Sequence, residues 1–119
     1  MNGKAFARLA VYLRSRYTRA CVKRLRFEWD ERKAAANRRK HGVAFEEAQT
    51  VFLDEDALLR PDEEHSEDED RFVLLGFSAQ LRTLVVCHCY RRQDEVIRII
   101  SARKANSLER GQYEDRRMR

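Results

Sequence analysis

The sequence predicts an α+β fold, with an antiparallel sheet of about four to five strands, two N-terminal helices and one C-terminal helix. Two segments with helical patterning come early, at 31–41 and 45–53, and a third helical segment closes the chain. Between them, three segments rich in β-branched and other apolar residues lie at 71–78, 82–90 and 96–101. Their short connections favour antiparallel neighbours, and helices set apart from a run of strands are typical of the α+β class.

The first half of this pattern is a short strand followed by two helices. Residues 25–29 alternate in the manner of a strand. Asp30 is a good N-cap for the helix at 31–41, because its carboxylate can accept hydrogen bonds from the free amides of the first turn. Gly42 is expected to end that helix in a left-handed conformation. Ala44 is a poor N-cap for the second helix, a small local inconsistency.

The second half adds strands and a final helix. Residues 57–60 predict a short strand that Pro61 stops, and the acidic segment at 62–70 predicts a loop. After the three strands described above, Ser101 is expected to cap a last helix from 102 to about 117.

Length and composition exclude several classes of protein. A chain of 119 residues supports one domain, and its 43% apolar content is ordinary for a globular protein. No apolar run approaches the roughly 18 residues that a membrane span requires, and no secretory signal is recognisable. Three cysteines are an odd and sparse set, which indicates reduced thiols and a cytoplasmic protein.

The net charge of +5 comes from the N-terminus. Residues 1–26 hold eight basic residues and no acid, whereas the remainder holds more acids than bases. Residues 1–24 therefore form a basic extension ahead of a domain at 25–119. This extension could be an amphipathic helix, a transit peptide, or the product of a mis-assigned start near Val22 or Leu25. The last explanation is favoured, because the strand pattern begins abruptly at Leu25.

Arg98 is unusual in the segment at 96–100, whose other side chains are apolar. Because an unpaired guanidinium is costly to bury, Arg98 would pair with an acid or reach the sheet edge. The functional alternative is a phosphate-binding arginine on a rigid strand. Arg103 and Lys104 are expected in the first turn of the last helix, where the dipole disfavours cations. Either an anion binds across that end, or both side chains point to water.

The helix at 31–41 has a basic and polar face, because Lys33, Asn37 and Lys40 or His41 recur at helical spacing. The helix dipole alone could explain Lys40 and His41 at the C-terminal end. The imidazole of His41 also titrates near neutral pH, which makes it a candidate general acid or base.

Two segments invite a metal-binding interpretation that their spacing does not support. His65 lies in the acidic segment at 62–70, which lacks regular ligand spacing. In the triplet Cys87, His88 and Cys89, a strand sends the thiols to one face and the imidazole to the other. Core thiols are therefore expected in place of a zinc site, and the sequence predicts no metal and no cofactor.

Taken together, several groups of residues resemble the BrnT family of bacterial toxins, over about residues 25 to 115. The matching groups are Phe27-Glu28-Trp29-Asp30 with Lys33 and Asn37; Lys40-His41-Gly42-Val43 with Phe45-Glu46-Glu47-Ala48; His65-Ser66-Glu67 with Arg71 and Gly76; and Arg98-Ile99-Ile100-Ser101-Ala102-Arg103-Lys104-Ala105, followed by Glu109 and Tyr113. The order of these groups is specific, although each group alone is weak. Residues 1–24 have no counterpart, and Ala44 departs from the polar residue usual at that position.

The resemblance implies a RelE-like fold and the toxin of a type II toxin–antitoxin pair, with RNA-cleaving activity that halts translation. It also implies a BrnA-like ribbon-helix-helix antitoxin, through which the complex would bind operator DNA and repress its own operon.

RNA can be cleaved without a metal when a base activates the 2′-OH, cations stabilise the dianionic transition state and an acid protonates the leaving oxygen. The candidate catalytic residues are His41, Arg98, Arg103, Lys40, Arg71, Glu109 and Tyr113. His41 is assigned as acid or base, and Arg98 and Arg103 as phosphate clamps. Glu109 and Tyr113 share one face of the last helix, so both also fit a packing and hydrogen-bonding role against the sheet.

Two other functions stay open. A catalytically inactive toxin could serve only as a binding module that holds its antitoxin and co-represses the operon. Alternatively, the basic residues of the N-terminal extension could bind nucleic acid directly.

Overall fold

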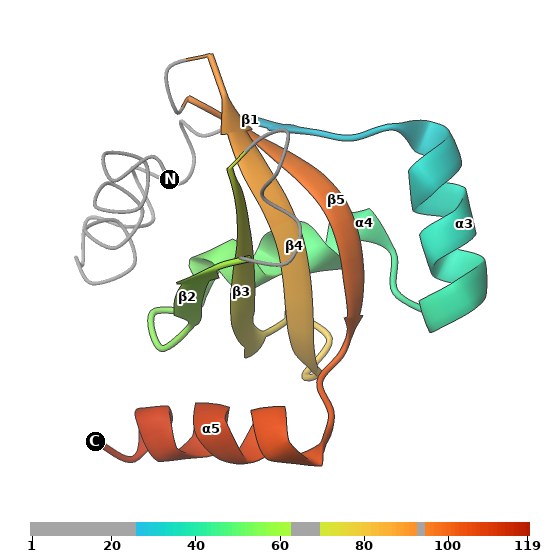
Figure 1. Cartoon of the computed structure of the whole chain (residues 1–119). Coiled ribbons are helices and arrows are strands. Elements are labelled where there is room, and N and C mark those ends of the chain that lie inside the picture. Colours follow the sequence, from blue (N-terminus) through green and yellow to red (C-terminus); the bar gives the residue numbers. More distant parts are fainter. Residues whose placement is uncertain (1–25, 63–69, 93–94) are drawn as a thin grey trace.

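The computed structural model describes residues 26–62, 70–92 and 95–119 (Figure 1). The elements follow in the order β1 (Arg26–Glu28), α3 (Glu31–His41), α4 (Phe45–Thr50), the 3₁₀ turn η1 (Val51–Leu53), β2 (Leu58–Pro61), β3 (Arg71–Phe77), β4 (Thr83–Arg91), β5 (Val96–Lys104) and α5 (Ser107–Arg117). The predicted α+β class is confirmed. The basic extension and His65 with most of the acidic segment lie outside the described residues.

The five strands form one sheet in the order β1-β5-β4-β3-β2. The three pairings from β2 to β5 are antiparallel, and those of β3 with β4 and of β4 with β5 were predicted from their short connections. The remaining pairing, of β1 with β5, is parallel, so the sheet is mixed. No hairpin links β1 to β5, and their relative direction is therefore not constrained by a turn.

Helix α3 begins and ends at the predicted residues. The carboxylate of Asp30 accepts hydrogen bonds from the amides of Arg32 (2.8 Å) and Lys33 (3.2 Å). Gly42 ends the helix with φ of 69°, a left-handed conformation that glycine adopts without steric cost. Ala44 makes no side-chain cap for α4, and the predicted second helix is split into α4 and η1.

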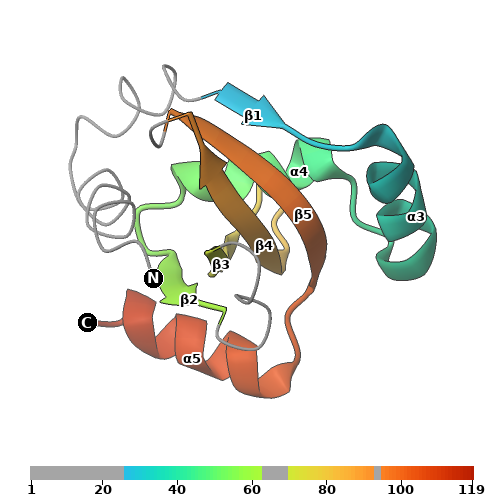
Figure 2. The same ribbon diagram turned by 45° about the horizontal axis from the view of Figure 1, so that its top comes forward.

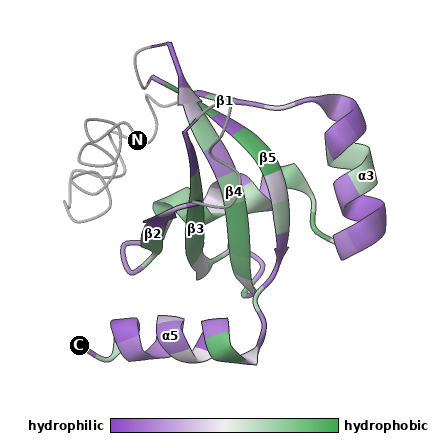
Figure 3. Cartoon of the chain, in the orientation of Figure 1, coloured by the Kyte–Doolittle hydropathy of each residue, from purple (hydrophilic) through white to green (hydrophobic). Residues whose placement is uncertain are grey.

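One face of the sheet, which we call the closed face, is covered by α4 and η1. Phe45, Ala48, Val51 and Phe52 pack there against apolar side chains of β3, β4 and β5. Figure 3 shows that hydrophobic residues are concentrated in the central strands, whereas α3 and α5 are mostly hydrophilic. This face therefore holds the main hydrophobic core.

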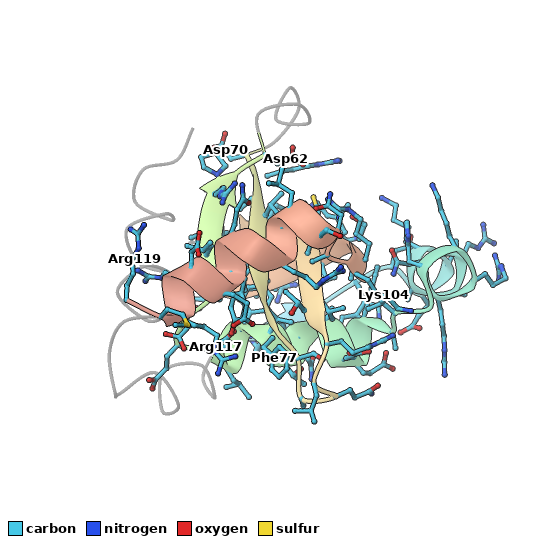
Figure 4. All side chains as sticks on the ribbon, turned by 90° about the horizontal axis from the view of Figure 1, so that it is seen from below. Asp62, Asp70, Phe77, Lys104, Arg117 and Arg119 are labelled. Carbon is cyan, nitrogen blue, oxygen red and sulfur yellow. The ribbon has the colours of Figure 1, made fainter. Side chains whose placement is uncertain are left out.

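The opposite face, which we call the open face, is covered by α5 only in part (Figures 1 and 2). Tyr113 of α5 joins a smaller cluster with Leu75, Val85 and Ala105. Figure 4 shows α5 lying across the sheet, with Lys104 on its α3 side. The part of the open face that α5 leaves uncovered is where a surface cleft forms.

The predicted start of the last helix is wrong. β5 continues to Lys104, and α5 begins at Ser107 after the N-cap Asn106. Asn106 and Glu109 form a capping box, which is a stronger start signal than a lone serine at 101. Arg103 and Lys104 are consequently strand residues, and the argument that they mark an anion site at a helix N-terminus does not hold.

A buried polar cluster fixes the connection between α3 and α4. Glu47 is only 4% exposed, and it accepts hydrogen bonds from Arg82 (Nε, 2.9 Å) and Ser78 (Oγ, 2.7 Å). Arg82 also donates to the carbonyl of Gly42 at 3.1 Å. The bonds from Arg82, opposed by burial, lower the pKa of Glu47. The end of α3 is thereby tied to the β3–β4 turn.

Within the part of the chain that the structure describes, no helix combines the length and apolar character needed to cross a membrane.

Candidate active site

A cleft of about 520 Å³ lies on the open face, between α5 and the strands β2 to β5. Its floor is apolar and includes Val73, Val85 and Ile100. Its polar lining includes Arg60, Asp62, Arg71, Ser101, Arg103 and Glu109. Three guanidinium groups and two carboxylates thus share one concave surface, which is suited to an anionic ligand.

Strand register explains how distant residues reach this cleft. Arg71 lies opposite Cys89 in the β3–β4 pairing, and Val85 lies opposite Arg103 in the β4–β5 pairing. Cys89 and Val85 are an even number of residues apart on β4 and so share a face. Arg71 and Arg103 therefore meet on the open face although they are 32 positions apart in the sequence.

A β-bulge brings Arg98 and Arg103 to the same face. These residues are five positions apart, and a regular strand would send them to opposite faces. The β4–β5 register slips between Cys87 and His88, which leaves Ile100 as the extra residue of β5. Bulges of this kind re-aim side chains, and here both arginines lie on the open face.

Arg103 is fixed by Glu109. Its two terminal nitrogens donate to the two carboxylate oxygens of Glu109 at 2.8 and 2.9 Å, a bidentate pair. The amide of Asn106 donates to the same carboxylate at 2.9 Å. The bonds from Arg103, against the cost of burial, lower the pKa of Glu109, and the same contact raises the pKa of Arg103. Both groups stay charged at neutral pH.

Arg98 does not line the cleft. Its guanidinium donates to the carboxylate of Glu28 on β1 at 2.7 Å, and Arg91 approaches the same oxygen at 4.0 Å. Of the two alternatives given for Arg98 from the sequence, the structure therefore shows the pairing with an acid. Its position on the open face keeps it on the same side of the sheet as the cleft.

Lys40 and His41 lie in the last turn of α3. Lys40 is exposed and His41 is half-buried. Neither residue is part of the cleft lining, which comes from β2, β3, β4, β5, α5 and Asp62. The structure thus brings Arg71, Arg103 and Glu109 together and places Lys40 and His41 on a neighbouring element.

Tyr113 is also outside the cleft. Its side chain is 1% exposed, and its hydroxyl donates to Asp54 at 2.5 Å. Burial raises the pKa of the phenol, and the bond to the Asp54 carboxylate adds to that effect. The same Oδ2 atom of Asp54 also accepts a hydrogen bond from the amide of Phe77 at 2.8 Å, and its Oδ1 accepts from the amide of Asp56 at 3.0 Å. Tyr113 therefore fits the packing and hydrogen-bonding role.

The triplet at 87–89 is arranged as strand geometry predicts. Cys89 is buried, as expected of a core thiol, but Cys87 is half-buried and lines the cleft, so the expectation is wrong for that residue. His88 is fully buried on the closed face beside Phe52. Burial, with Asp62 nearby, raises the pKa of the Cys87 thiol to about 12. Burial lowers the pKa of His88 to about 4. Among the described residues, no three His, Cys, Asp or Glu side chains are grouped to hold a metal ion.

Sequence reasoning missed Arg60 and Asp62 as lining residues of the cleft. Arg60 lies on the edge strand β2 and donates to Gln112 of α5 at 3.2 Å. A single arginine before a proline gives no pattern that would mark it. Only the pairing of β2 with β3 brings it to the cleft.

Comparisons with known proteins agree with this architecture. Residues 29–109 match the family model described as the ribonuclease toxin BrnT of a type II toxin–antitoxin system. The structure is similar to the crystal structure of the Brucella abortus ribonuclease toxin BrnT, with a TM-score of 0.55 and 25% sequence identity over 70% of this chain and 99% of that one. No curated protein matches the chain in sequence. Because the family model spans more than half of the sequence, the chain belongs to the BrnT family of ribonuclease toxins.

Proposed function

We propose that this protein is a metal-independent endoribonuclease whose active site is the cleft on the open face. The observation that carries the proposal is the convergence of Arg71, Arg103 and Glu109 on that cleft. Fixed guanidinium groups stabilise the extra negative charge that develops on a phosphate during attack by a neighbouring oxygen. A cleft with three arginines can supply this charge from its own side chains.

In the proposed reaction, Arg71 and Arg103 bind the non-bridging oxygens of the scissile phosphate. The Glu109 carboxylate accepts the proton of the 2′-OH, whose oxygen attacks phosphorus, and the 5′-oxygen leaves. The products are a 2′,3′-cyclic phosphate and a 5′-hydroxyl, so no co-reactant is consumed. Because Arg103 lowers the pKa of Glu109, this carboxylate is ionised at neutral pH but weakly basic, which suits a slow nuclease.

The remaining predicted residues take peripheral roles in this proposal. His41 is the candidate acid that protonates the leaving oxygen, and it would have to reach RNA from the end of α3. Arg98, held by Glu28, and Lys40 contribute positive charge beside the cleft. Tyr113 supports α5 through its bond to Asp54.

As the toxin of a type II pair, the protein has an antitoxin partner. We propose that this antitoxin is a BrnA-like ribbon-helix-helix protein, through which the complex binds operator DNA. Cleavage of cytoplasmic RNA would then inhibit translation whenever the antitoxin is absent.

The direct test is incubation of the purified full chain, free of antitoxin, with RNA in EDTA. RNA should be degraded, with cyclic phosphate ends, and Arg103→Ala should lower the rate by roughly 10² to 10³. Arg117→Ala is the matched control. Like Arg103, Arg117 is an arginine paired with a glutamate of α5 (Glu114, at 3.6 Å), but it does not line the cleft.

Two results would contradict the proposal. Degradation abolished by EDTA would exclude the metal-independent reaction. RNA left intact by a protein that still binds its antitoxin would favour the alternative, an inactive binding module.

A further inference from the structure

Helix α3 runs beside β5 at the margin of the open face (Figures 1 and 2). β1 pairs with β5 only as far as Arg98, and beyond that point Asn37 of α3 takes over the free edge. The Asn37 side chain donates to the carbonyl of Ala102 at 2.8 Å and accepts from its amide at 3.1 Å. Asn37 therefore fixes both the position and the rotation of α3 against the sheet.

That rotation decides which side chains face the open side. Ala34 packs against the core of the closed face. At about 100° per residue, Lys33 and Lys40 lie on the other side of Asn37 from Ala34. They therefore project toward the open face, whereas Arg32 and Arg39 point away from the sheet.

The position of Lys33 near β5 has independent support. Two backbone hydrogen bonds are the main causes that lower the pKa of Asp30, and the charges of Lys33 and Arg98 add to them. Both cations thus lie near the same carboxylate, at the start of α3. Lys33 and Arg98 thus lie at the same end of α3, and Lys40 is two turns further along, past the contact of Asn37 with Ala102 of β5.

The charge of α3 is not neutralised within the described residues. All five of its lysines and arginines are exposed, and none forms an ion pair in the described parts of the chain (Figure 4). The large exposed apolar side chains are Leu53, Leu81, Leu108 and Met118, and none of them lies on α3.

These features of α3 favour RNA over a protein as its binding partner. Protein interfaces are enriched in aromatic residues, methionine and arginine and depleted in lysine. α3 has no Phe, Tyr, Trp or Met, and its cations on the open-face side are lysines. A polyanionic strand is bound by lysines and arginines in a row. α3 packs against β5, and β5 supplies Ile100, Ser101 and Arg103 to the cleft, so Lys33 and Lys40 flank the strand that forms one side of the cleft.

We propose that Lys33 and Lys40 form a docking strip for single-stranded RNA, which holds the phosphates that flank the scissile one along the β5 edge. This inference rests on the proposed function, since it extends the substrate beyond the cleft. It predicts that long RNA binds more tightly than short RNA, because only a long strand reaches both the cleft and the strip.

The test measures binding of the full chain to an RNA of about 12 nucleotides with 2′-O-methyl sugars, which cannot be cleaved through the 2′-OH. The double variant Lys33→Gln/Lys40→Gln should bind roughly tenfold more weakly and lower the salt slope by about 1.4, as loss of two phosphate contacts on a single strand requires. The matched control Arg32→Gln/Arg39→Gln removes the same charge from the outward side of α3 and should change the affinity less than about twofold.

Each outcome separates this inference from the proposed function. Equal losses in both double variants would overturn the strip, because they would show only an effect of net charge. Loss of antitoxin binding with RNA binding unchanged would also overturn it, and would assign the same lysines to the protein partner. A selective loss of RNA binding supports the strip even if the wild-type chain cleaves no RNA, a result that would defeat the nuclease proposal alone.

Discussion

The two faces of the sheet differ in what their side chains do. The closed face places Phe52, Val86 and Ile99 against α4 and η1 with no exposure above 1%. The open face carries arginines on the same strands, at the alternate positions, and α5 covers only one end of it. β3 and β5 thus contribute apolar residues to the core on one side and an arginine to the cleft on the other.

This difference teaches which changes should affect folding and which should affect activity. Burial of apolar area on the closed face supplies most of the stability. Charges on the open face are half-exposed, and exposed ion pairs contribute little to stability. Changes on the closed face should therefore alter the free energy of unfolding, and changes on the open face should alter RNA cleavage.

The largest expected change in the free energy of unfolding comes from a substitution at Phe52 on the closed face. Phe52→Ala should lower the free energy of unfolding by about 4 kcal/mol, because it leaves a cavity beside Phe27 and His88, whose rings lie 5.3 and 4.8 Å away. Urea denaturation measures this value. Leu53→Ala is the control one residue later, where the side chain is 51% exposed, and it should cost less than about 1 kcal/mol. Similar costs at both positions would contradict the assignment of the closed face as the core.

The second prediction concerns the pH dependence of stability that comes from His88, which is buried on the closed face. Because burial lowers the pKa of His88 from 6.5 to about 4, the unfolded chain binds the proton more readily than the folded chain. The contribution of neutral His88 to the free energy of unfolding is complete above pH 6.5. It is lost as the pH falls toward 4, by up to about 3 kcal/mol. Unfolding curves between pH 7 and pH 4.5 measure the slope. His88→Phe should flatten it, and an unchanged slope in that variant would assign the acid sensitivity to other groups.

Much of the fold was predictable because its signals are local. Asp30, the helix formers after it and Gly42 each specify a feature of α3 within a few residues, and α3 has the predicted bounds. The last helix was misplaced because Ser101 looked like a cap, whereas β5 continues through Arg103 to pair with β4. That pairing is a tertiary contact, and tertiary contacts override weak local preferences.

The site was less predictable than the fold. The convergence of Arg71, Arg103 and Glu109 on the cleft depends on strand register, and the placement of Arg98 and Arg103 on one face depends on the bulge at Ile100. A one-residue slip moves every later side chain to the opposite face, and the sequence does not mark where the slip occurs. Arg60 was missed because only the pairing of β2 with β3, a contact between segments distant in sequence, brings it to the cleft.

The third prediction tests the open face through Glu109→Gln. The amide oxygen can still accept from the Asn106 amide, and the bond from the backbone of residue 109 to Asn106 is unaffected, so α5 keeps its capping box, but the charged bidentate pair with Arg103 is lost. RNA cleavage should fall on the order of 10²-fold, with little change in the free energy of unfolding. The pH dependence of the rate distinguishes the two roles of this carboxylate. If Glu109 is the base, the acid limb of the profile disappears in the variant; if it only positions Arg103, the limb remains and the rate is lower throughout.

The smallest expected effect lies at the start of α4, where the closed face begins. Ala44 has extended dihedral angles that suit an N-cap but no side chain that can accept a hydrogen bond. Ala44→Ser should raise the free energy of unfolding by about 1 kcal/mol, because its hydroxyl can accept from the amides of the first turn. Serine is preferable to aspartate here, since Glu46 and Glu47 already place negative charge in that turn. RNA cleavage should stay at the wild-type rate, because α4 lies on the far side of the sheet from the cleft. A change in cleavage at constant stability would show that the two faces are coupled.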